Sequence, residues 1–168
     1  FVAACYTNVM GIEETILLTK AMVKHGEVLK LSKYPVIDKH SIGGVPGNRT
    51  TMVVVPIVAA AGYFIPKTSS RSITSPAGTA DTMEVLANVT FPINKMKDII
   101  IKTNGCIVWG GSLNLAPADD KIISVERPLE IDAESQLLAS IIAKKHSVSS
   151  THILIDIPIG KDAKVKNS

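Results

Sequence analysis

Short apolar runs alternate with helical patterns along this chain of 168 residues, and this alternation limits the folds that it can adopt. Few tight hairpin signals separate the apolar runs. Strands that are joined by helices form parallel sheets, because a parallel pair needs a long crossover connection. The sequence therefore predicts an α/β fold with a mainly parallel sheet and flanking helices. We expect strands at 34–37, 63–65, 106–109 and 153–157, and helices at 11–25, 51–61, 79–87, 93–102 and 133–145.

The composition suits a globular core and argues against several classes of partner. Hydrophobic residues make up 46% of the chain, aromatic residues make up 4%, and the net charge is +3. Nucleic-acid surfaces need clustered basic residues or stacking rings, so we expect no nucleic-acid partner. No apolar run approaches the roughly 20 residues of a membrane span, so we expect no membrane partner. Two cysteines cannot build a disulfide framework, which favours a reducing, cytoplasmic location.

The two ends of the sequence lead to an expectation about its length. The chain begins with Phe1 rather than Met, and its first ten residues lack the basic leader of a signal peptide. It ends in 164–168, directly after a strong strand pattern. We expect from these features that the chain is a piece of a longer protein.

The segment 38–50 reads Asp-Lys-His-Ser-Ile-Gly-Gly-Val-Pro-Gly-Asn-Arg-Thr and is expected to join a strand to a helix. Its glycines let the backbone approach a ligand closely, and unpaired amides at a helix start attract anions. Lys39 adds positive charge, which favours phosphate. Neither a Walker A pattern nor the dinucleotide pattern GxGxxG is present. From these residues alone, an anion site and a simple tight turn both remain open.

A second loop, 67–79, contains seven hydroxyl residues and Arg71. Hydroxyls donate to phosphate or sugar oxygens, and arginine offers a planar fork to an oxyanion. The alternative is a solvated loop in which Thr79 caps the next helix. Ligands of such sheets bind beyond the carboxyl ends of the strands. We therefore expect the site among the loops 38–50, 66–79, 110–120 and 158–164.

Three further positions carry candidate chemistry around the last predicted helix. Asp132 precedes this helix, where it either caps the helix or acts as a general acid. Ser140 and Lys144 share one helix face at a spacing of one turn. The adjacent carboxylates Asp119 and Asp120 are expected to be solvated. No cluster of residues has the spacing of metal ligands, so we expect no metal.

Three segments of the sequence resemble the thymidine phosphorylase family of nucleoside phosphorylases. They are 38–44 (Asp-Lys-His-Ser-Ile-Gly-Gly), 69–84 with Ser-Pro-Ala-Gly-Thr at its centre, and 140–145 (Ser-Ile-Ile-Ala-Lys-Lys). The segment 114–120, Asn-Leu-Ala-Pro-Ala-Asp-Asp, is similar to the branch that contains archaeal AMP phosphorylases and bacterial type 2 thymidine phosphorylases. The resemblance runs over essentially the whole chain, in order.

The resemblance implies a nucleoside phosphorylase/phosphoribosyltransferase-like architecture in which a helical lobe and an α/β lobe enclose the active site. Members of this family are much longer, so this fragment is expected to be inactive alone and the full-length protein to be a homo-oligomer. The implied division is 1–33 as the end of the helical lobe, 34–120 as the phosphate-binding α/β lobe, 121–150 as a return to the helical lobe, and 151–168 as the next α/β strand.

The same resemblance implies roles for individual residues. Asp132 matches the proton donor, and His40 matches a catalytic residue on the base side. The role of Arg127 stays open, because its distance in sequence to Ser140 is shorter than in the thymidine enzymes. The implied phosphate-binding residues are Lys39, Ser41, Thr50, Ser69 and Thr79. The implied substrate-binding residues are Gly44, Ser70, Arg71, Ser72, Ile73, Thr74, Ser75, Thr79, Ser140, Lys144 and Lys164.

The implied reaction is phosphorolysis of the N-glycosidic bond of a nucleoside or nucleoside monophosphate. Its products are a free base and a ribose or deoxyribose 1-phosphate. Inorganic phosphate is a co-substrate, and no cofactor is expected. Thymidine and AMP both remain open as substrates, although the hydroxyls and Arg71 of the second loop lean towards AMP. Two alternatives are a phosphoribosyltransferase of the anthranilate class, whose glycine-threonine-glycine loop is missing here, and a non-catalytic nucleotide-binding module.

Overall fold

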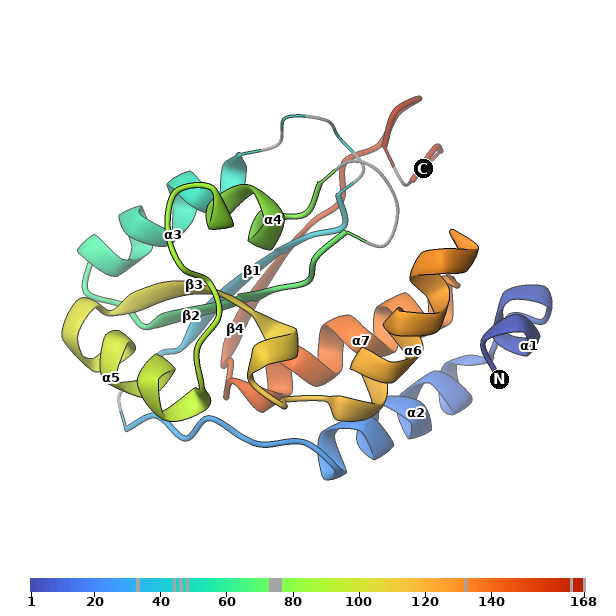
Figure 1. Ribbon diagram of the computed structural model, residues 1–168, viewed down its shortest axis with the longest axis horizontal. Helices are drawn as coiled ribbons and strands as arrows, with labels where there is room; N and C mark the ends of the chain where they lie inside the picture. The colour runs from blue at the N-terminus through green and yellow to red at the C-terminus, as the bar shows by residue number, and fades with distance from the viewer. Residues whose placement is uncertain are drawn as a thin grey trace.

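Strands and helices alternate along the chain in the computed structural model, which describes residues 1–32, 34–43, 45, 47, 49–72, 77–131, 133–163 and 165–167. This alternation is the order that the apolar runs predicted. The elements are α1 (Val2–Thr7), α2 (Ile12–Lys24), β1 (Ile37–Ser41), α3 (Thr50–Ala60), β2 (Ile65–Ser69), α4 (Thr79–Glu84), α5 (Ile93–Thr103), β3 (Gly105–Trp109), the 3-10 turn η1 (Gly110–Ser112), α6 (Pro117–Leu129), α7 (Glu134–Ser147) and β4 (His152–Asp156) (Figure 1).

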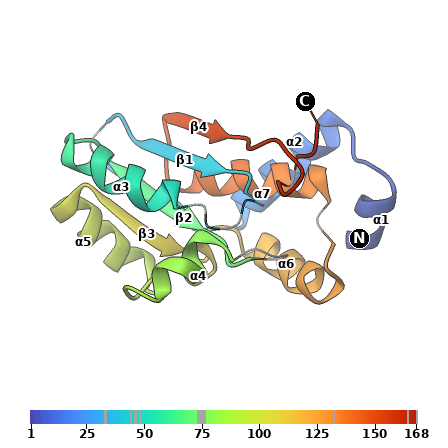
Figure 2. The ribbon, with the colours of Figure 1, turned by 90° about the horizontal axis from the view of Figure 1, so that it is seen from above.

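The strands run parallel in the order β4-β1-β2-β3 (Figure 2). Strand β1 pairs with β4, and β2 pairs with β3. A bridge between Val36 and Phe64 joins the two pairs, and the Ile37 amide donates to the Phe64 carbonyl oxygen at 2.7 Å. The prediction of an α/β fold with a parallel sheet is confirmed.

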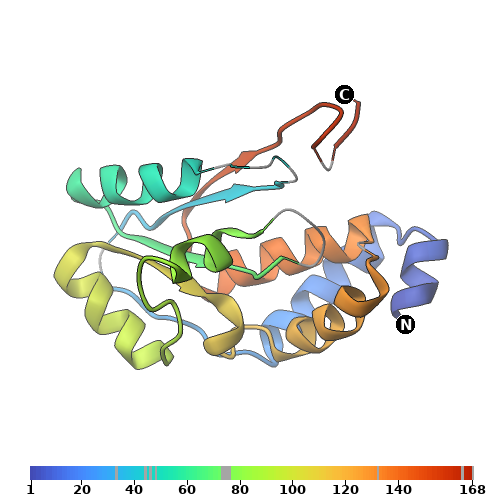
Figure 3. The same ribbon diagram turned by 45° about the horizontal axis from the view of Figure 1, so that its top comes forward.

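Helices cover both faces of this sheet. Helix α3 lies on one face, whereas α5 and α7 lie on the other (Figure 3). The main apolar core lies between strands and α5, where Val36, Phe64 and Val108 pack with Met96 and Ile100. Helices α1, α2 and α6 gather beside α7, so a helical layer adjoins one end of the sheet. Within the described ranges, no helix is long and apolar enough to cross a membrane.

Two strands begin and end later in the sequence than their patterns predicted. The predicted strands 34–37 and 63–65 are observed as Ile37–Ser41 and Ile65–Ser69, so both run into the predicted loops. The sequence did not predict these residues as strand residues because they are polar, yet several of them are buried in ion pairs. The Asp38 carboxylate is buried and pairs with Lys145 Nζ at 2.8 Å. Lys39 Nζ pairs with Asp156 at 3.1 Å.

Helix α6 was not expected, and it occupies the end of the predicted loop 110–120. Pro117 stands at its first turn, where the missing amide hydrogen costs nothing. Asp119 and Asp120 follow in the same turn, and Arg127 lies in the last turn, so both ends carry charges that suit the helix dipole. Two prolines obscured this pattern, because proline usually argues against a helix. The lobe boundaries that the resemblance implied stay predictions.

The buried face of α7 is made largely of small and charged residues. Leu138 on this helix is 49% exposed. Ala139 and Ala143 are buried instead and pack on Met22 of α2. Lys144 and Lys145 are buried on the same helix. Small residues let α7 lie close to α2, and the two lysines find carboxylates on neighbouring elements.

The buried Asp38–Lys145 pair gives the first prediction. Replacing Asp38 by alanine leaves the Lys145 ammonium buried without its counter-charge, so we expect the free energy of unfolding to fall by about 3–5 kcal/mol. The double variant Asp38→Leu, Lys145→Met removes both charges, and we expect it to lose much less. Urea unfolding of both variants and of Lys145→Met measures this. Equal losses in the single and double variants would show that the charges do not depend on one another.

Candidate functional site

The carboxyl ends of all four strands meet at one edge of the sheet, because the strands are parallel (Figure 2). Strands β1, β2, β3 and β4 end there at Ser41, Ser69, Trp109 and Asp156. Several predicted site residues therefore lie at this edge. The predicted residues Thr50 and Thr79 begin α3 and α4, the helices that follow the two predicted loops.

The first predicted phosphate loop is organised around Asp156. Its carboxylate accepts from Lys39 Nζ at 3.1 Å and is also hydrogen-bonded by the Ser41 side chain. These bonds lower the pKa of Asp156 below its ordinary value, with the Lys39 bond as the largest cause. Lys39 and Ser41, two predicted phosphate ligands, are thus held together by one carboxylate at the end of β4.

His40 lies among lysines on the same strand. Burial is the main cause that lowers the pKa of His40 to about 2, and the charges of Lys67, Lys145, Lys144 and Lys39 add to it. The imidazole is therefore neutral at physiological pH. A neutral ring can donate one hydrogen bond and accept another, but it does not deliver a proton as a cation. The catalytic role of His40 stays a prediction, and a neutral ring fits that role through hydrogen bonds rather than proton delivery.

Lys67 is a buried residue that sequence reasoning had placed in a loop. It lies on β2, and its Nζ donates to the Thr68 carbonyl oxygen. Burial lowers the pKa of Lys67 well below its usual range, and the nearby Lys145 ammonium lowers it further. The side chain is consequently part of the interior beneath the site, whereas a solvated loop lysine would keep its charge.

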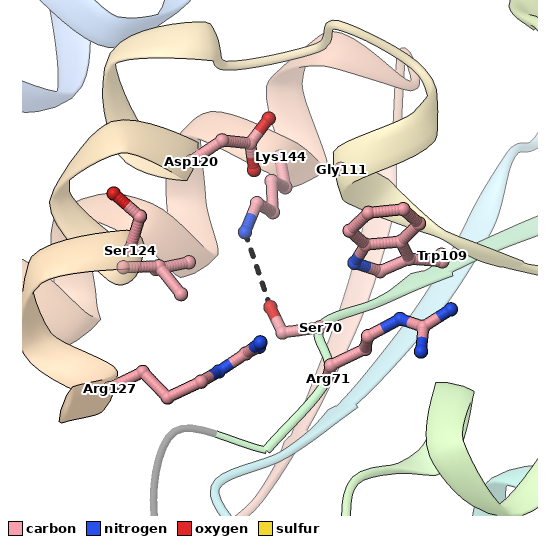
Figure 4. A pocket seen from close by; sticks show the side chains of 9 residues that line it. Ser70, Arg71, Trp109, Gly111, Asp120, Ser124, Arg127 and Lys144 are labelled. Carbon is pink, nitrogen blue, oxygen red and sulfur yellow. Dashed lines mark hydrogen bonds between the residues drawn. The ribbon is translucent and has the colours of Figure 1, made fainter. Parts of the chain in front are cut away.

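A pocket of about 90 Å³ opens between the sheet edge and helix α6 (Figure 4). Lys144 and Ser70 face one another across it. Burial raises the pKa of Asp120, whereas Lys144 acts in the opposite direction. The volume is enough for several water-sized groups. The pocket is lined by Ser70, Arg71, Trp109, Gly111, Asp120, Ile123, Ser124, Arg127 and Lys144.

The sequence did not predict most of the residues with which α6 lines this pocket, and it left the role of Arg127 undecided. Asp120, Ser124 and Arg127 are spaced by four and three residues, so they share one face of a helix. That spacing was a usable signal once 117–129 was taken as helical. Trp109 carried no signal as a site residue, because an aromatic residue at a strand end is usually part of the core.

Lys144 lies at the centre of a hydrogen-bonded group. Its Nζ lies 2.6 Å from Asp119 Oδ2, 3.2 Å from Ser70 Oγ and 3.4 Å from Ser140 Oγ. Ser140 Oγ in turn donates to Asp119 Oδ2 at 2.9 Å. The expectation that Asp119 is solvated was wrong: only 1% of this residue is exposed, and Asp120 is also partly buried. Ser70, Ser140 and Lys144, all predicted substrate residues, are brought together here.

The second predicted loop is tied to its surroundings at both described ends. Arg71 lies over the Trp109 ring at 4.6 Å and pairs with Glu84 at 2.7 Å. The Asp81 carboxylate accepts from the amides of Ser72 and Gly78 at 2.8 and 2.9 Å. Gly78 is the N-cap of α4, whereas the solvated-loop alternative placed Thr79 there.

Several predicted residues lie outside the part of the chain that the structure describes. They are Gly44, Ile73, Thr74, Ser75, Asp132 and Lys164. Their assignments stay predictions. Among the described residues, no group of histidine, cysteine and acidic side chains has a geometry that could hold a metal ion.

The pKa of His40 leads to a prediction about acid stability. A histidine in an unfolded chain takes up a proton near pH 6.5, whereas folded His40, with a pKa of about 2, stays neutral. Below pH 6.5 the unfolded state therefore binds more protons, and stability falls as the pH falls. The loss is at most about 1.4 kcal/mol per pH unit between pH 6.5 and 4. His40→Gln should remove this part of the slope in urea unfolding; an unchanged slope would contradict the low pKa.

The sequence is similar to those of curated proteins named as phosphorylases. A protein of Acidovorax sp. strain JS42 with the name "Putative thymidine phosphorylase 1" is 57% identical over 168 residues, covering 100% of this chain and 33% of that protein. The AMP phosphorylase of Pyrococcus furiosus is 57% identical over 167 residues, covering 99% and 33%. The chain thus spans about a third of the length of the curated relatives that it matches.

A solved structure shares the fold at low sequence identity. The anthranilate phosphoribosyltransferase of Thermus thermophilus matches with a TM-score of 0.69 and 20% identity, covering 86% of this chain and 43% of that one. The resemblance that the sequence motifs indicated is confirmed by the relatives. The model of the glycosyl transferase family, a/b domain, matches residues 33–152, so the chain belongs to this glycosyl transferase family.

Proposed function

We propose that this chain is part of a pentosyltransferase that cleaves the N-glycosidic bond of a nucleoside or nucleoside monophosphate with inorganic phosphate. The observation that carries the proposal is that predicted phosphate-binding residues and predicted substrate-binding residues lie at the same edge of the sheet. Ser41 and Ser69 end β1 and β2, and Lys39 lies within β1. Ser70 and Lys144 line the adjoining pocket. Relatives named AMP phosphorylase support the same reaction.

We assign phosphate binding and base binding to different residues on the basis of their charge and position. The hydroxyls and the one ammonium of the phosphate site position phosphate for attack on the anomeric carbon. The proposed phosphate ligands are Lys39, Ser41, Thr50, Ser69 and Thr79. The base is to occupy the pocket beside Lys144. The sugar passes through a cation-like state, and the departing base gains negative charge, which the Lys144 ammonium stabilises.

A proton donor to the leaving base remains part of the proposal. The family resemblance assigns this role to Asp132, and a neutral carboxylic acid suits it. His40 is neutral with a pKa of about 2, so it contributes hydrogen bonds to the substrate rather than a proton. Inorganic phosphate is the co-substrate, and the proposed reaction needs no cofactor.

Substrate choice and assembly are finer parts of the same proposal. Hydroxyls and Arg71 in the second loop favour a substrate with a 5′-phosphate, which leans towards AMP over thymidine. The relatives carry both names. We also propose a cytoplasmic location and a homo-oligomeric full-length protein.

The phosphoribosyltransferase alternative draws support only from architecture. The solved anthranilate phosphoribosyltransferase is 20% identical, which supports a common fold and no common substrate. The much more similar relatives are named as phosphorylases. The phosphorylase proposal is therefore the better supported of the two, and a non-catalytic nucleotide-binding role is the outcome if no turnover is found.

The proposed reaction is tested by following base release from AMP, thymidine and uridine by the full-length protein, with and without phosphate. We expect release that depends on phosphate. Lys39→Ala should reduce the phosphate-dependent rate at least about 100-fold, because one ammonium is lost from the anion site. Lys97→Ala, which removes an exposed ammonium on α5, serves as the control and should retain turnover. Wild-type turnover in Lys39→Ala would refute the role of Lys39.

A further inference from the structure

We propose that Asp119 is a positioning residue that holds Ser140 and Lys144 and sets which groups of the base pocket donate and which accept hydrogen bonds. The inference rests on the proposed function, because it concerns how the same pocket recognises a nucleobase. The motifs gave Asp119 no role of its own.

One buried oxygen holds both predicted substrate residues of α7. Asp119 Oδ2 accepts from Lys144 Nζ at 2.6 Å and from Ser140 Oγ at 2.9 Å. The Asp119 side chain is 2% exposed and that of Lys144 is 8% exposed, so water competes little for these bonds. Asp119 lies on α6, whereas Ser140 and Lys144 lie on α7. The carboxylate therefore fixes two side chains relative to a different helix.

The direction of these bonds determines what the pocket offers to a ligand. A carboxylate only accepts, so Ser140 uses its hydroxyl proton on Asp119 and keeps its oxygen lone pairs for other donors. Lys144 has three donors, and they are directed at Asp119, Ser70 and Ser140. Ser70 accepts from Lys144, so its own hydroxyl proton is available to the pocket (Figure 4).

This arrangement fits one edge of a nucleobase. A ring nitrogen or carbonyl oxygen of the base accepts from the Ser70 hydroxyl, and an adjacent N–H of the base donates to Ser140. The Lys144 ammonium, whose three donors are already used within the group, acts through its charge. Without Asp119, the Ser140 hydroxyl is free to turn and Lys144 loses its counter-charge. The pocket then presents donors where the base also presents a donor, so affinity for the base falls. The phosphate residues Lys39 and Ser41 are held by Asp156 instead, so they are unaffected.

The test uses Asp119→Asn in the full-length protein, which keeps the side-chain volume and removes the charge. We expect kcat/KM for AMP or thymidine to fall about 10- to 100-fold through misplacement of Lys144 and Ser140. The KM for phosphate should stay within about twofold of wild type, which also shows that the variant is folded. Asp98→Asn changes an exposed carboxylate on α5 that does not line the pocket, and it is the matched control.

A double-mutant comparison separates positioning from a general loss of structure. Ser140→Ala should cost much less in the Asp119→Asn background than in wild type, because both act through one hydrogen-bonded group. Additive losses, or an equal rise in the KM for phosphate and for the nucleoside, would overturn the inference. Should Asp119→Asn fail to fold, the set of Ser140→Ala, Lys144→Met and their double variant gives the same comparison, and additivity there overturns it too.

Calorimetry with AMP keeps the inference separate from the proposed reaction. A wild-type protein that binds AMP without phosphorolysis refutes the proposed reaction alone, and weaker AMP binding by Asp119→Asn then supports the inference. Equal AMP affinity in Asp119→Asn and wild type overturns the inference even if phosphorolysis is confirmed. A wild type that neither binds nor cleaves AMP or thymidine overturns both.

Discussion

The buried ion pair between Asp38 and Lys145 connects the sheet to the helical layer, and the arrangement of the site depends on it. Asp38 lies on β1 and Lys145 on α7, with 2.8 Å between Oδ2 and Nζ. A buried charge without its partner is costly, so the pair holds β1 and α7 in a fixed position relative to one another. The neighbouring residues Lys39 and Lys144 thereby lie at the same sheet edge, where we propose that phosphate and base bind.

Charge balance explains how several lysines can lie together in this interior. Lys39, Lys144 and Lys145 each pair with a carboxylate, namely Asp156, Asp119 and Asp38. Lys67 is instead bonded to a backbone carbonyl, and burial lowers its pKa. Burial keeps His40 neutral, and the same positive surroundings add to this effect. A site of this kind is preorganised for an anion, because its cations are held in place before the anion arrives.

The fold class was predictable because apolar runs and helical patterns report backbone periodicity directly. The strand ends were not, since Asp38 and Lys67 read as loop residues until their buried partners are known. Helix α6 was missed because Pro117 and Pro128 argue against a helix locally, although Pro117 stands in the first turn, where proline is tolerated. In the candidate site, the spacing of Ser140 and Lys144 predicted that they share a helix face, and they do lie together. Their role in binding stays a prediction from the motif. Asp119 was not predictable, because its partners are distant in sequence.

The sequence by itself determined the parallel α/β class, the family, and the residue types available for phosphate and base. These properties follow from local patterns and short motifs, which need no knowledge of distant contacts. Only the tertiary structure decided which charges are buried, which carboxylate holds which lysine, and that α6 forms one wall of the pocket. Burial and pairing depend on residues as far apart as Lys39 and Asp156 or Asp119 and Lys144, and only folding brings them within hydrogen-bond distance.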